Sequence, residues 1–297
     1  MNRQSAKPTT IGFIGFGEAA RAFVSDWRER GHAAEISAYD ILLDREQSRD
    51  EIIAACAGLG VTPLPSALAV CEAATYLISA VTVDQTLQAA RSVGDLGRHQ
   101  RYLDINSAAP KTKKAAAGIV GPGYLDVAVL SPVSPMRSEV PILIGGRHAS
   151  SETEFLARFF PGADVFSDQV GEASLVKMVR SIFVKGIEAV ATECALAACK
   201  AGLAEVVFPS LDAALRHDDV RQLAGYTMER VAVHGARRAA EMDEVCDTLA
   251  DLGLPHPMSK GAAELQRTVG ALDIDTARNA DAEAIARKIL ERIGSTR

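Results

Sequence analysis

The sequence has few cysteines, no long apolar run and no cluster of basic residues, and each absence narrows what the chain can be. The five cysteines are scattered through 297 residues, and no C-x-x-C pair or cysteine–histidine cluster suggests a metal, so we expect reduced thiols and no metal site. No apolar stretch reaches the roughly 18 residues that a membrane span needs. The formal net charge of −6, with no basic run to offset it, argues against a nucleic-acid partner.

The rest of the composition fits one large globular domain or two smaller ones. Apolar residues make up 48% of the chain, which predicts an ample core and is compatible with a large subunit interface. The segment from Met1 to Thr9 is polar and lacks the apolar core of a signal peptide. We therefore expect a short lead-in segment and a cytoplasmic protein with no membrane partner.

A glycine-rich turn organises the first part of the chain. Ile11–Ile14 has the pattern of a buried strand, and Gly15-x-Gly17-x-x-Ala20 follows it before an amphipathic helix. Gly15 permits a tight turn, Gly17 lets the backbone approach a pyrophosphate, and Ala20 keeps the helix close to the strand. The helix N-terminus offers free N–H groups and a positive dipole end to phosphates. The turn therefore predicts a dinucleotide-binding site.

An acidic residue follows at the spacing that such sites use. Asp40 ends the next expected strand, 25 positions after Gly15, where roughly 20 are typical of the acid that binds the ribose hydroxyls. A carboxylate there would repel a 2′-phosphate, so NAD is favoured over NADP. The alternative is that Asp40 only caps a loop. Arg45 follows closely and could still tolerate the 2′-phosphate, which keeps NADP possible.

Strand-like and helical segments alternate through the first half of the chain, which predicts a parallel, doubly wound sheet. Ligands in such sheets bind beyond the carboxyl ends of the strands. The backbone at Val81 and Thr82 would line the cofactor, and Asn106 and Ser107 would face the nicotinamide or the substrate. The alternative for Asn106 and Ser107 is capping of the helix that Pro110 starts. The residues assigned to the cofactor are Gly15, Phe16, Gly17, Glu18, Ala19, Asp40, Val81, Thr82 and Asn106.

A proline-containing loop lies between two further expected strands, 125–130 and 140–146. Ser131, Ser134 and Arg137 in this loop could bind a carboxylate through hydroxyls, backbone N–H groups and a guanidinium. The alternative is a plain connecting loop.

From about Gly171 onward the pattern is helix after helix, so we divide the chain into a dinucleotide-binding domain, 1–168, and an all-helical domain, 169–297, for substrate binding and dimerisation. The first helix spans Ala173–Lys200 and places Lys177 and Ser181 on one face, because they are four residues apart. Lys177 is either a solvated lysine or a functional one. His234, in a later helix, could contact substrate or be structural.

In these motifs the chain resembles the β-hydroxyacid dehydrogenase superfamily, which includes 3-hydroxyisobutyrate and 6-phosphogluconate dehydrogenases. The resemblance covers nearly the whole chain and is most specific in the last of four segments, which matches the family segment carrying the catalytic lysine. The C-terminal part, with His234, looks most like a poorly characterised branch named for 6-phosphogluconate dehydrogenase. The four segments are Gly12–Gly17, Asp104–Pro110, Asp126–Val129 with the following serine loop, and Gly171–Met178.

The resemblance implies a Rossmann-type domain, an all-α second domain, commonly a homodimer, and a small acidic substrate whose carboxylate binds near Ser131 and Ser134. It also implies catalytic roles for Lys177, Ser131 and Ser181, and substrate contacts from Ser107, Ser131, Ser134 and His234. This chain departs from the family in having Ser181 where asparagine is common and Pro132-Val133 where a glycine pair is usual. Both departures argue for an unusual substrate.

The mechanism that we expect is hydride transfer between NAD and a small hydroxy acid. Neutral Lys177 would remove the hydroxyl proton and return it in the reverse direction. Because a solvated lysine titrates near 10.4, the site must lower the pKa of Lys177 by burial. Two alternatives remain: an imine-reductase-like enzyme, although the lysine is commonly replaced there, and a non-catalytic NAD(H)-binding regulator.

Overall fold

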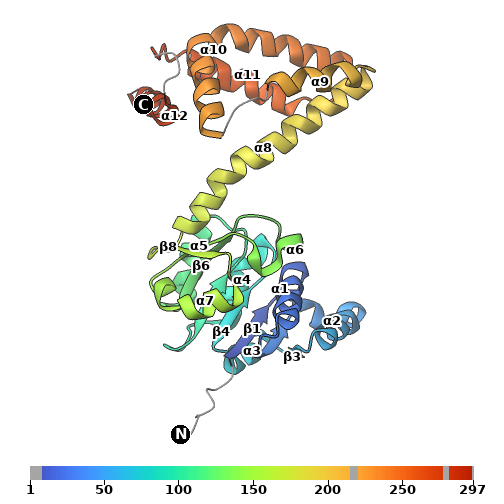
Figure 1. Ribbon diagram of the computed structural model, residues 1–297, viewed down its shortest axis with the longest axis vertical. Helices are drawn as coiled ribbons and strands as arrows, with labels where there is room; N and C mark the ends of the chain where they lie inside the picture. Colours follow the sequence, from blue (N-terminus) through green and yellow to red (C-terminus); the bar gives the residue numbers. More distant parts are fainter. Residues whose placement is uncertain (1–8, 215–219, 277–280, 296–297) are drawn as a thin grey trace. The chain divides into compact units, whose positions relative to one another are not determined.

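The computed structural model describes residues 9–214, 220–276 and 281–295. The chain divides into two compact units, Met1–Ser181 and Ile182–Arg297. The boundary predicted from the sequence lies slightly earlier, between residues 168 and 169, and it stays a prediction. Figure 1 shows the first unit as a sheet covered by helices and the second as helices alone, in agreement with the expected fold class.

One eight-stranded sheet with the order β3-β2-β1-β4-β5-β6-β7-β8 runs through the first unit. All neighbouring strands are parallel except β6 and β7, which are antiparallel. The parallel sheet expected from the alternating strands and helices holds from β1 to β6, whereas β7 turns back, because only a four-residue helix and a 3₁₀ turn (Arg137–Glu139) separate it from β6 and a parallel crossover usually needs a full helix. The strands are β1 (Thr9–Ile14), β2 (Ala34–Tyr39), β3 (Thr62–Pro63), β4 (Tyr76–Ser79), β5 (Arg101–Asp104), β6 (Tyr124–Val129), β7 (Ile142–Gly145) and β8 (Ala163–Ser167).

Helices cover both faces of this sheet. One face packs against α1 (Glu18–Glu29), α2 (Glu46–Gly58) and α7 (Thr153–Phe159), and the other against α3 (Ala67–Ala73), α4 (Thr86–Val93) and α5 (Pro110–Val120). The side chains of β4 alternate between the two layers, since Ile78 packs in the first and Leu77 in the second. The strand order reverses between β1 and β4, which is where doubly wound sheets bind their ligands.

The first core layer is built on aromatic rings. Trp27 stacks on Phe23 and meets Phe159 and Phe160 edge to face, at centroid distances of 5.1–6.1 Å. Its indole N–H donates to the carbonyl of Phe159 at 2.6 Å. Such a ring cluster holds α1, and therefore the glycine turn that precedes it, rigidly against the sheet.

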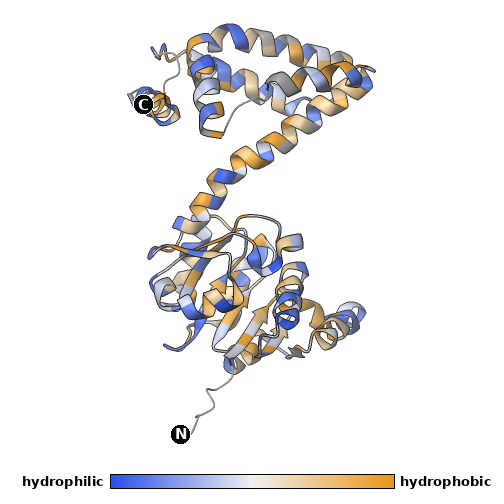
Figure 2. Ribbon diagram, viewed as in Figure 1, coloured by the Kyte–Doolittle hydropathy of each residue, from blue (hydrophilic) through white to orange (hydrophobic). Residues whose placement is uncertain are grey.

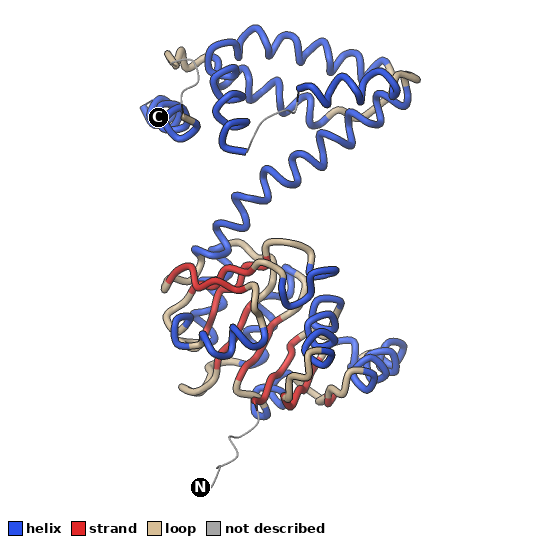
Figure 3. The backbone as a smooth tube through the Cα atoms, in the orientation of Figure 1, coloured by secondary structure: helices blue, strands red, loops and turns tan. Residues whose placement is uncertain are grey.

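Among its described residues the second unit consists of helices joined by short loops, with no strand (Figure 3). Helix α8 (Glu172–Lys200) begins in the first unit and continues into the second, where α9 (Ala204–Ala214), α10 (Val220–Asp251), α11 (Pro257–Gly270) and α12 (Ala282–Ser295) follow. Glu193 of α8 caps α11, accepting hydrogen bonds from the N–H groups of Met258 and Ser259 at 3.0 and 2.9 Å. Among the described helices, none is both long and apolar enough to cross a membrane.

Candidate active site

The glycine turn after β1 has the geometry expected of a phosphate-binding turn. Gly15 adopts φ +87°, and a Cβ there would lie 2.4 Å from the carbonyl oxygen of Ala80. Gly17 is the N-cap of α1, and no described side chain caps that helix. A Cβ at Gly17 would meet no described atom within 4 Å, so the space in front of the helix N-terminus is open. The turn can therefore present unpaired N–H groups to an anion.

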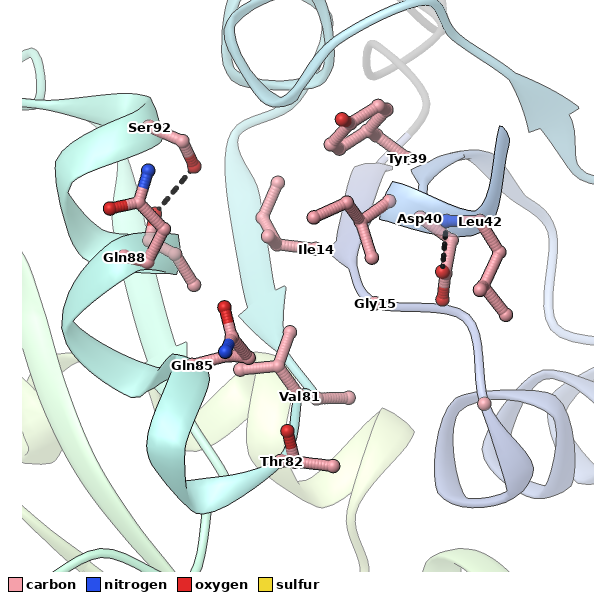
Figure 4. A pocket seen from close by; sticks show the side chains of 14 residues that line it. Ile14, Gly15, Tyr39, Asp40, Leu42, Val81, Thr82, Gln85, Gln88 and Ser92 are labelled. Carbon is pink, nitrogen blue, oxygen red and sulfur yellow. Dashed lines mark hydrogen bonds between the residues drawn. The ribbon is translucent and has the colours of Figure 1, made fainter. Parts of the chain in front are cut away.

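A pocket of 360 Å³ opens beside this turn (Figure 4). In the figure Gln85, Gln88 and Ser92 line one side of it, and Tyr39, Asp40 and Leu42 line the other. The lining is mainly apolar with a few amide, hydroxyl and carboxylate groups, as is usual for a site that takes a flat organic ligand. Its position at the reversal of strand order suits the nucleoside half of a dinucleotide.

Asp40 performs the capping role that the sequence left as an alternative. One carboxylate oxygen accepts the N–H of Phe16 at 2.8 Å, and the other accepts the N–H of Leu42 at 2.9 Å, capping the short 3₁₀ helix Ile41–Asp44. Asp40 nevertheless lines the pocket, and each carboxylate oxygen can accept a second hydrogen bond. The Asp40 carboxylate can thus hold the glycine turn and, at the same time, accept hydrogen bonds from a ribose.

Asn106, at the end of β5, holds the neighbouring strand end. Its side-chain oxygen accepts the N–H of Val81 at 2.7 Å, and its amide nitrogen donates to the hydroxyl of Ser79 at 2.9 Å. The residue is only 4% exposed. Ala109, and neither Asn106 nor Ser107, is the N-cap of α5, so the capping alternative for these two residues is not observed. Asn106 therefore shapes the loop at Val81 that lines the pocket.

Lys177 and Ser107 meet at this same edge of the sheet. The ammonium of Lys177 donates to the Ser107 hydroxyl at 2.7 Å, although the two residues are 70 positions apart. The Ser181 hydroxyl, one turn further along α8, donates to the carbonyl of Lys177 at 2.8 Å. Arg180 donates to the carbonyl of Leu130, at the end of β6, at 2.6 Å and so ties α8 to the strand that leads into Ser131.

The serine loop contains a short helix, α6 (Val133–Met136), with Ser131 partly exposed before it and Ser134 exposed within it. Arg137 ends the loop and forms ion pairs with Glu29 and, at 3.7 Å, with Asp26 of α1. These acidic partners occupy the guanidinium in the structure, and a role for Arg137 in binding a substrate carboxylate stays a prediction. The roles of Ser131 and Ser134 stay predictions.

His234 lies on α10 in the second unit, where it is exposed. A role in substrate binding stays a prediction for it. Among the described residues no group of histidine, cysteine and acidic side chains could hold a metal ion, and the five cysteines are unpaired.

Sequence reasoning missed a buried polar cluster between β5, β6, α5 and the start of α8. Lys113 is fully buried, with its ammonium 3.0 Å from Asp104 Oδ1 and 3.6 Å from Asp126 Oδ1. Tyr124 donates its hydroxyl to Asp104 at 2.6 Å, and burial together with the Asp104 charge raises the pKa of Tyr124. Two aspartates within otherwise apolar strand patterns were the signal available in the sequence.

These features define a dinucleotide-binding α/β protein with a helical second unit and a lysine at the ligand-binding edge of its sheet. Comparison with known proteins is consistent with that class. Residues 198–269 match the model of a domain of unknown function, DUF1932. An uncharacterized 28.5 kDa protein of Methanothermus fervidus is 25% identical over 239 residues, 79% of this chain and 88% of that protein.

Solved structures identify the family. A conserved hypothetical protein from Sinorhizobium meliloti is 33% identical, with a TM-score of 0.59 over 97% of this chain and 98% of its own. The conserved protein MTH1747, described as structurally similar to 3-hydroxyacid dehydrogenases, is 31% identical, with a TM-score of 0.54 over 88% and 97%. An imine reductase of Streptomyces aurantiacus shares the fold at 17% identity, with a TM-score of 0.67 over 95% and 99%. The chain belongs to the β-hydroxyacid dehydrogenase superfamily of NAD(P)-dependent oxidoreductases, as the resemblance indicated.

Proposed function

We propose that the protein is a dehydrogenase that transfers a hydride between NAD and a small hydroxy acid, with Lys177 as the general acid and base. The observation that carries this proposal is the 2.7 Å hydrogen bond between Lys177 and Ser107 at the carboxyl ends of the strands. The glycine turn and the 360 Å³ pocket belong to the same unit. A proton acceptor and a nucleotide site are the two components that such a reaction requires.

The residues around the glycine turn fit a nicotinamide dinucleotide. The N–H groups at the start of α1 would bind the pyrophosphate, and Asp40 would accept hydrogen bonds from the ribose hydroxyls. Ile41 and Leu42 line the pocket beside Asp40 and offer no cation to a 2′-phosphate, which supports NAD over NADP. When bound, the nicotinamide ring accepts or returns the hydride.

The protein groups would handle the proton and the carboxylate. Lys177, in its neutral form, takes the proton of the substrate hydroxyl as charge develops on that oxygen, and in the reverse direction its ammonium returns the proton. Ser107 holds the amine in place and can itself donate to the reacting oxygen. Ser131 and Ser134 would bind the substrate carboxylate, and Ser181 would border the site from the next turn of α8. His234 would contact substrate, and the helical domain, residues 169–297, would serve substrate binding and dimerisation.

We also propose that the protein acts as a homodimer through its helical part. Many large apolar side chains of α8 and α9 are exposed in the single chain, and Figure 2 shows the apolar residues recurring along α8. Patches of that extent mark subunit interfaces in proteins of this size. The exposed residues are Ile182, Phe183, Ile187, Val190, Leu196, Val206, Phe208 and Leu211.

The test is a screen for NADH formation with short 3-hydroxy acids, aldonates and branched sugar acids, with NADP in parallel. Lys177→Ala should lower kcat on the order of 100-fold or more, because positioned acid–base groups contribute 10²–10⁴-fold, while NADH binding stays unchanged. Lys111→Ala is the matched control, since Lys111 is an exposed lysine of α5.

Retention of turnover by Lys177→Ala would overturn the catalytic assignment. Turnover of cyclic imines with NADPH, in place of hydroxy acids, would favour the imine-reductase alternative. NADH binding without turnover of any substrate would favour a regulator.

A further inference from the structure

We infer that the buried cluster of Asp104, Lys113 and Asp126 positions Lys177 against Ser107, with Asp126 and Lys113 as positioning residues. The expected effect on catalysis rests on the proposed function. The positioning of Lys177 rests on the geometry alone. The cluster joins the two elements that carry the pair, because Asp104 ends β5, three residues before Ser107, and Asp126 contacts the first turn of α8.

Asp126 is the residue that holds α8. It is fully buried, and its Oδ2 accepts the N–H groups of Gly171 and Ser174 at 2.9 and 3.0 Å. A carboxylate at this position caps the helix and complements its positive dipole end. Lys177 follows Ser174 by three residues, and Arg180 anchors the next turn to Leu130. The segment that carries Lys177 is thus held on both sides.

Lys113 links this cap to β5. Its ammonium donates to the carbonyl of Asp104 at 2.5 Å and lies 3.0 Å from the carboxylate of the same residue. Asp104 also accepts the N–H of Asn106 at 2.9 Å, which orients the strand end immediately before Ser107. Two buried carboxylates share this one ammonium. Asp126 Oδ2 has the two N–H donors at the start of α8, whereas its buried Oδ1 has no hydrogen-bond partner and faces the Lys113 ammonium at 3.6 Å, so the Asp126 charge depends on Lys113.

The residue before α8 lies against α5. Gly171 adopts φ +101°, and a Cβ there would lie 2.8 Å from Lys114 Cε of α5. The start of α8 therefore contacts α5, the helix that also supplies Lys113. In reactions that depend on a near-attack geometry, a displacement of about 1 Å costs on the order of 100-fold in rate.

The decisive variant is Asp126→Asn, which keeps an oxygen for the two N–H groups but removes the charge that pairs with Lys113. Its matched control is Glu152→Gln. Glu152 is also a buried carboxylate of the first unit, but it binds Tyr76 and Arg101, which start β4 and β5 at the opposite edge of the sheet. Both variants should unfold at lower temperature than the wild type.

The first readout compares how much each variant changes kcat and how much it changes KM. Asp126→Asn should lower kcat on the order of 10- to 100-fold with NADH affinity unchanged, and Glu152→Gln should leave kcat unchanged. Lys113→Arg, which retains a charge and donors, should retain more activity than Lys113→Met. Equal kcat values for Asp126→Asn and Glu152→Gln would overturn the inference.

The second readout needs no substrate. Acetylation of Lys177 by acetic anhydride, measured by mass spectrometry relative to exposed Lys111, reports whether the amine is held by Ser107. Asp126→Asn and Ser107→Ala should each raise the relative rate about fivefold, the factor that corresponds to one ordinary hydrogen bond, and Glu152→Gln should not. An unchanged rate in Asp126→Asn would refute the positioning even if Lys177 is catalytic, and a raised rate would support it even if Lys177→Ala retains turnover.

Discussion

The two units of this chain are packed in different ways. The first buries large aromatic side chains, with Trp27 only 1% exposed at the centre of its ring cluster. In the second, α10 and α11 approach backbone to backbone: a Cβ at Gly235 would lie 2.4 Å from the carbonyl of Gln266 and 2.7 Å from Gly270 Cα. Its buried residues include several alanines, namely Ala198, Ala232, Ala239 and Ala263.

The difference indicates how much each unit needs a partner. A sheet with helices on both faces covers its own apolar surface, so the first unit can hold a precise site by itself. Helices that pack through glycine and alanine bury little apolar area per residue, and many large apolar side chains of α8 and α9 are exposed. The second unit is therefore suited to association.

Trp27→Ala should destabilise the first unit by about 3–5 kcal/mol, the usual cost of removing a large ring from a packed core. Calorimetry should show the transition of the first unit lowered and that of the helical unit unchanged. Phe166→Ala is the control, since Phe166 is an aromatic residue of the same unit that is 50% exposed, and it should change little. Equal shifts of both transitions would show that the units are not independent.

Gly235→Ala should destabilise the helical unit by about 1–3 kcal/mol, because the added Cβ overpacks the contact between α10 and α11. Circular dichroism should report the loss, while the fluorescence of Trp27, the single tryptophan, should report an unchanged first unit. Gly261→Ala, also on α11, is the control: its Cβ would meet no described atom within 4 Å, so it should stabilise the helix by about 0.5–1 kcal/mol. The same sign for both variants would contradict the close approach.

Ile187→Lys should weaken the proposed dimer about tenfold, or ~1.4 kcal/mol, because a charge would enter an apolar interface. Ile187 is 52% exposed in the single chain. Sedimentation equilibrium measures the dissociation constant, and Lys185→Ala on the same helix serves as the control. A monomeric wild type at all concentrations would end the homodimer proposal.

Asp26→Asn should cost about 1 kcal/mol of stability at neutral pH. Burial raises the pKa of Asp26, but hydrogen bonds from Ser138 and Arg30 outweigh it and hold the pKa below the ordinary 3.8. Because the folded-state pKa is depressed, this contribution is present above pH 3.8 and is lost as the pH falls toward the folded-state value. Urea unfolding followed by Trp27 fluorescence should show the wild type and the variant converging in acid, whereas a constant difference would exclude this linkage.

The sequence predicted the fold well where the signals are local. The glycine turn, the strand before it and the long helix with Lys177 follow from glycine spacing and apolar periodicity, and the structure confirms them. The sequence did not show that β7 runs antiparallel or that Arg137 pairs with acids of α1. The direction of β7 depends on how the short connection from β6 folds, and the Arg137 pair joins residues 108 positions apart.

The candidate site likewise combines features that follow from local sequence with contacts between distant residues. The nucleotide-binding turn and the segment that carries Lys177 can be predicted from the amino-acid sequence, because local backbone conformation and short residue spacing suffice for them. The hydrogen bond between Lys177 and Ser107 and the capping of α8 by Asp126 become visible in the folded chain alone. These contacts join residues 45 to 70 positions apart. They form because buried charges and helix ends must find partners wherever the packed chain provides them.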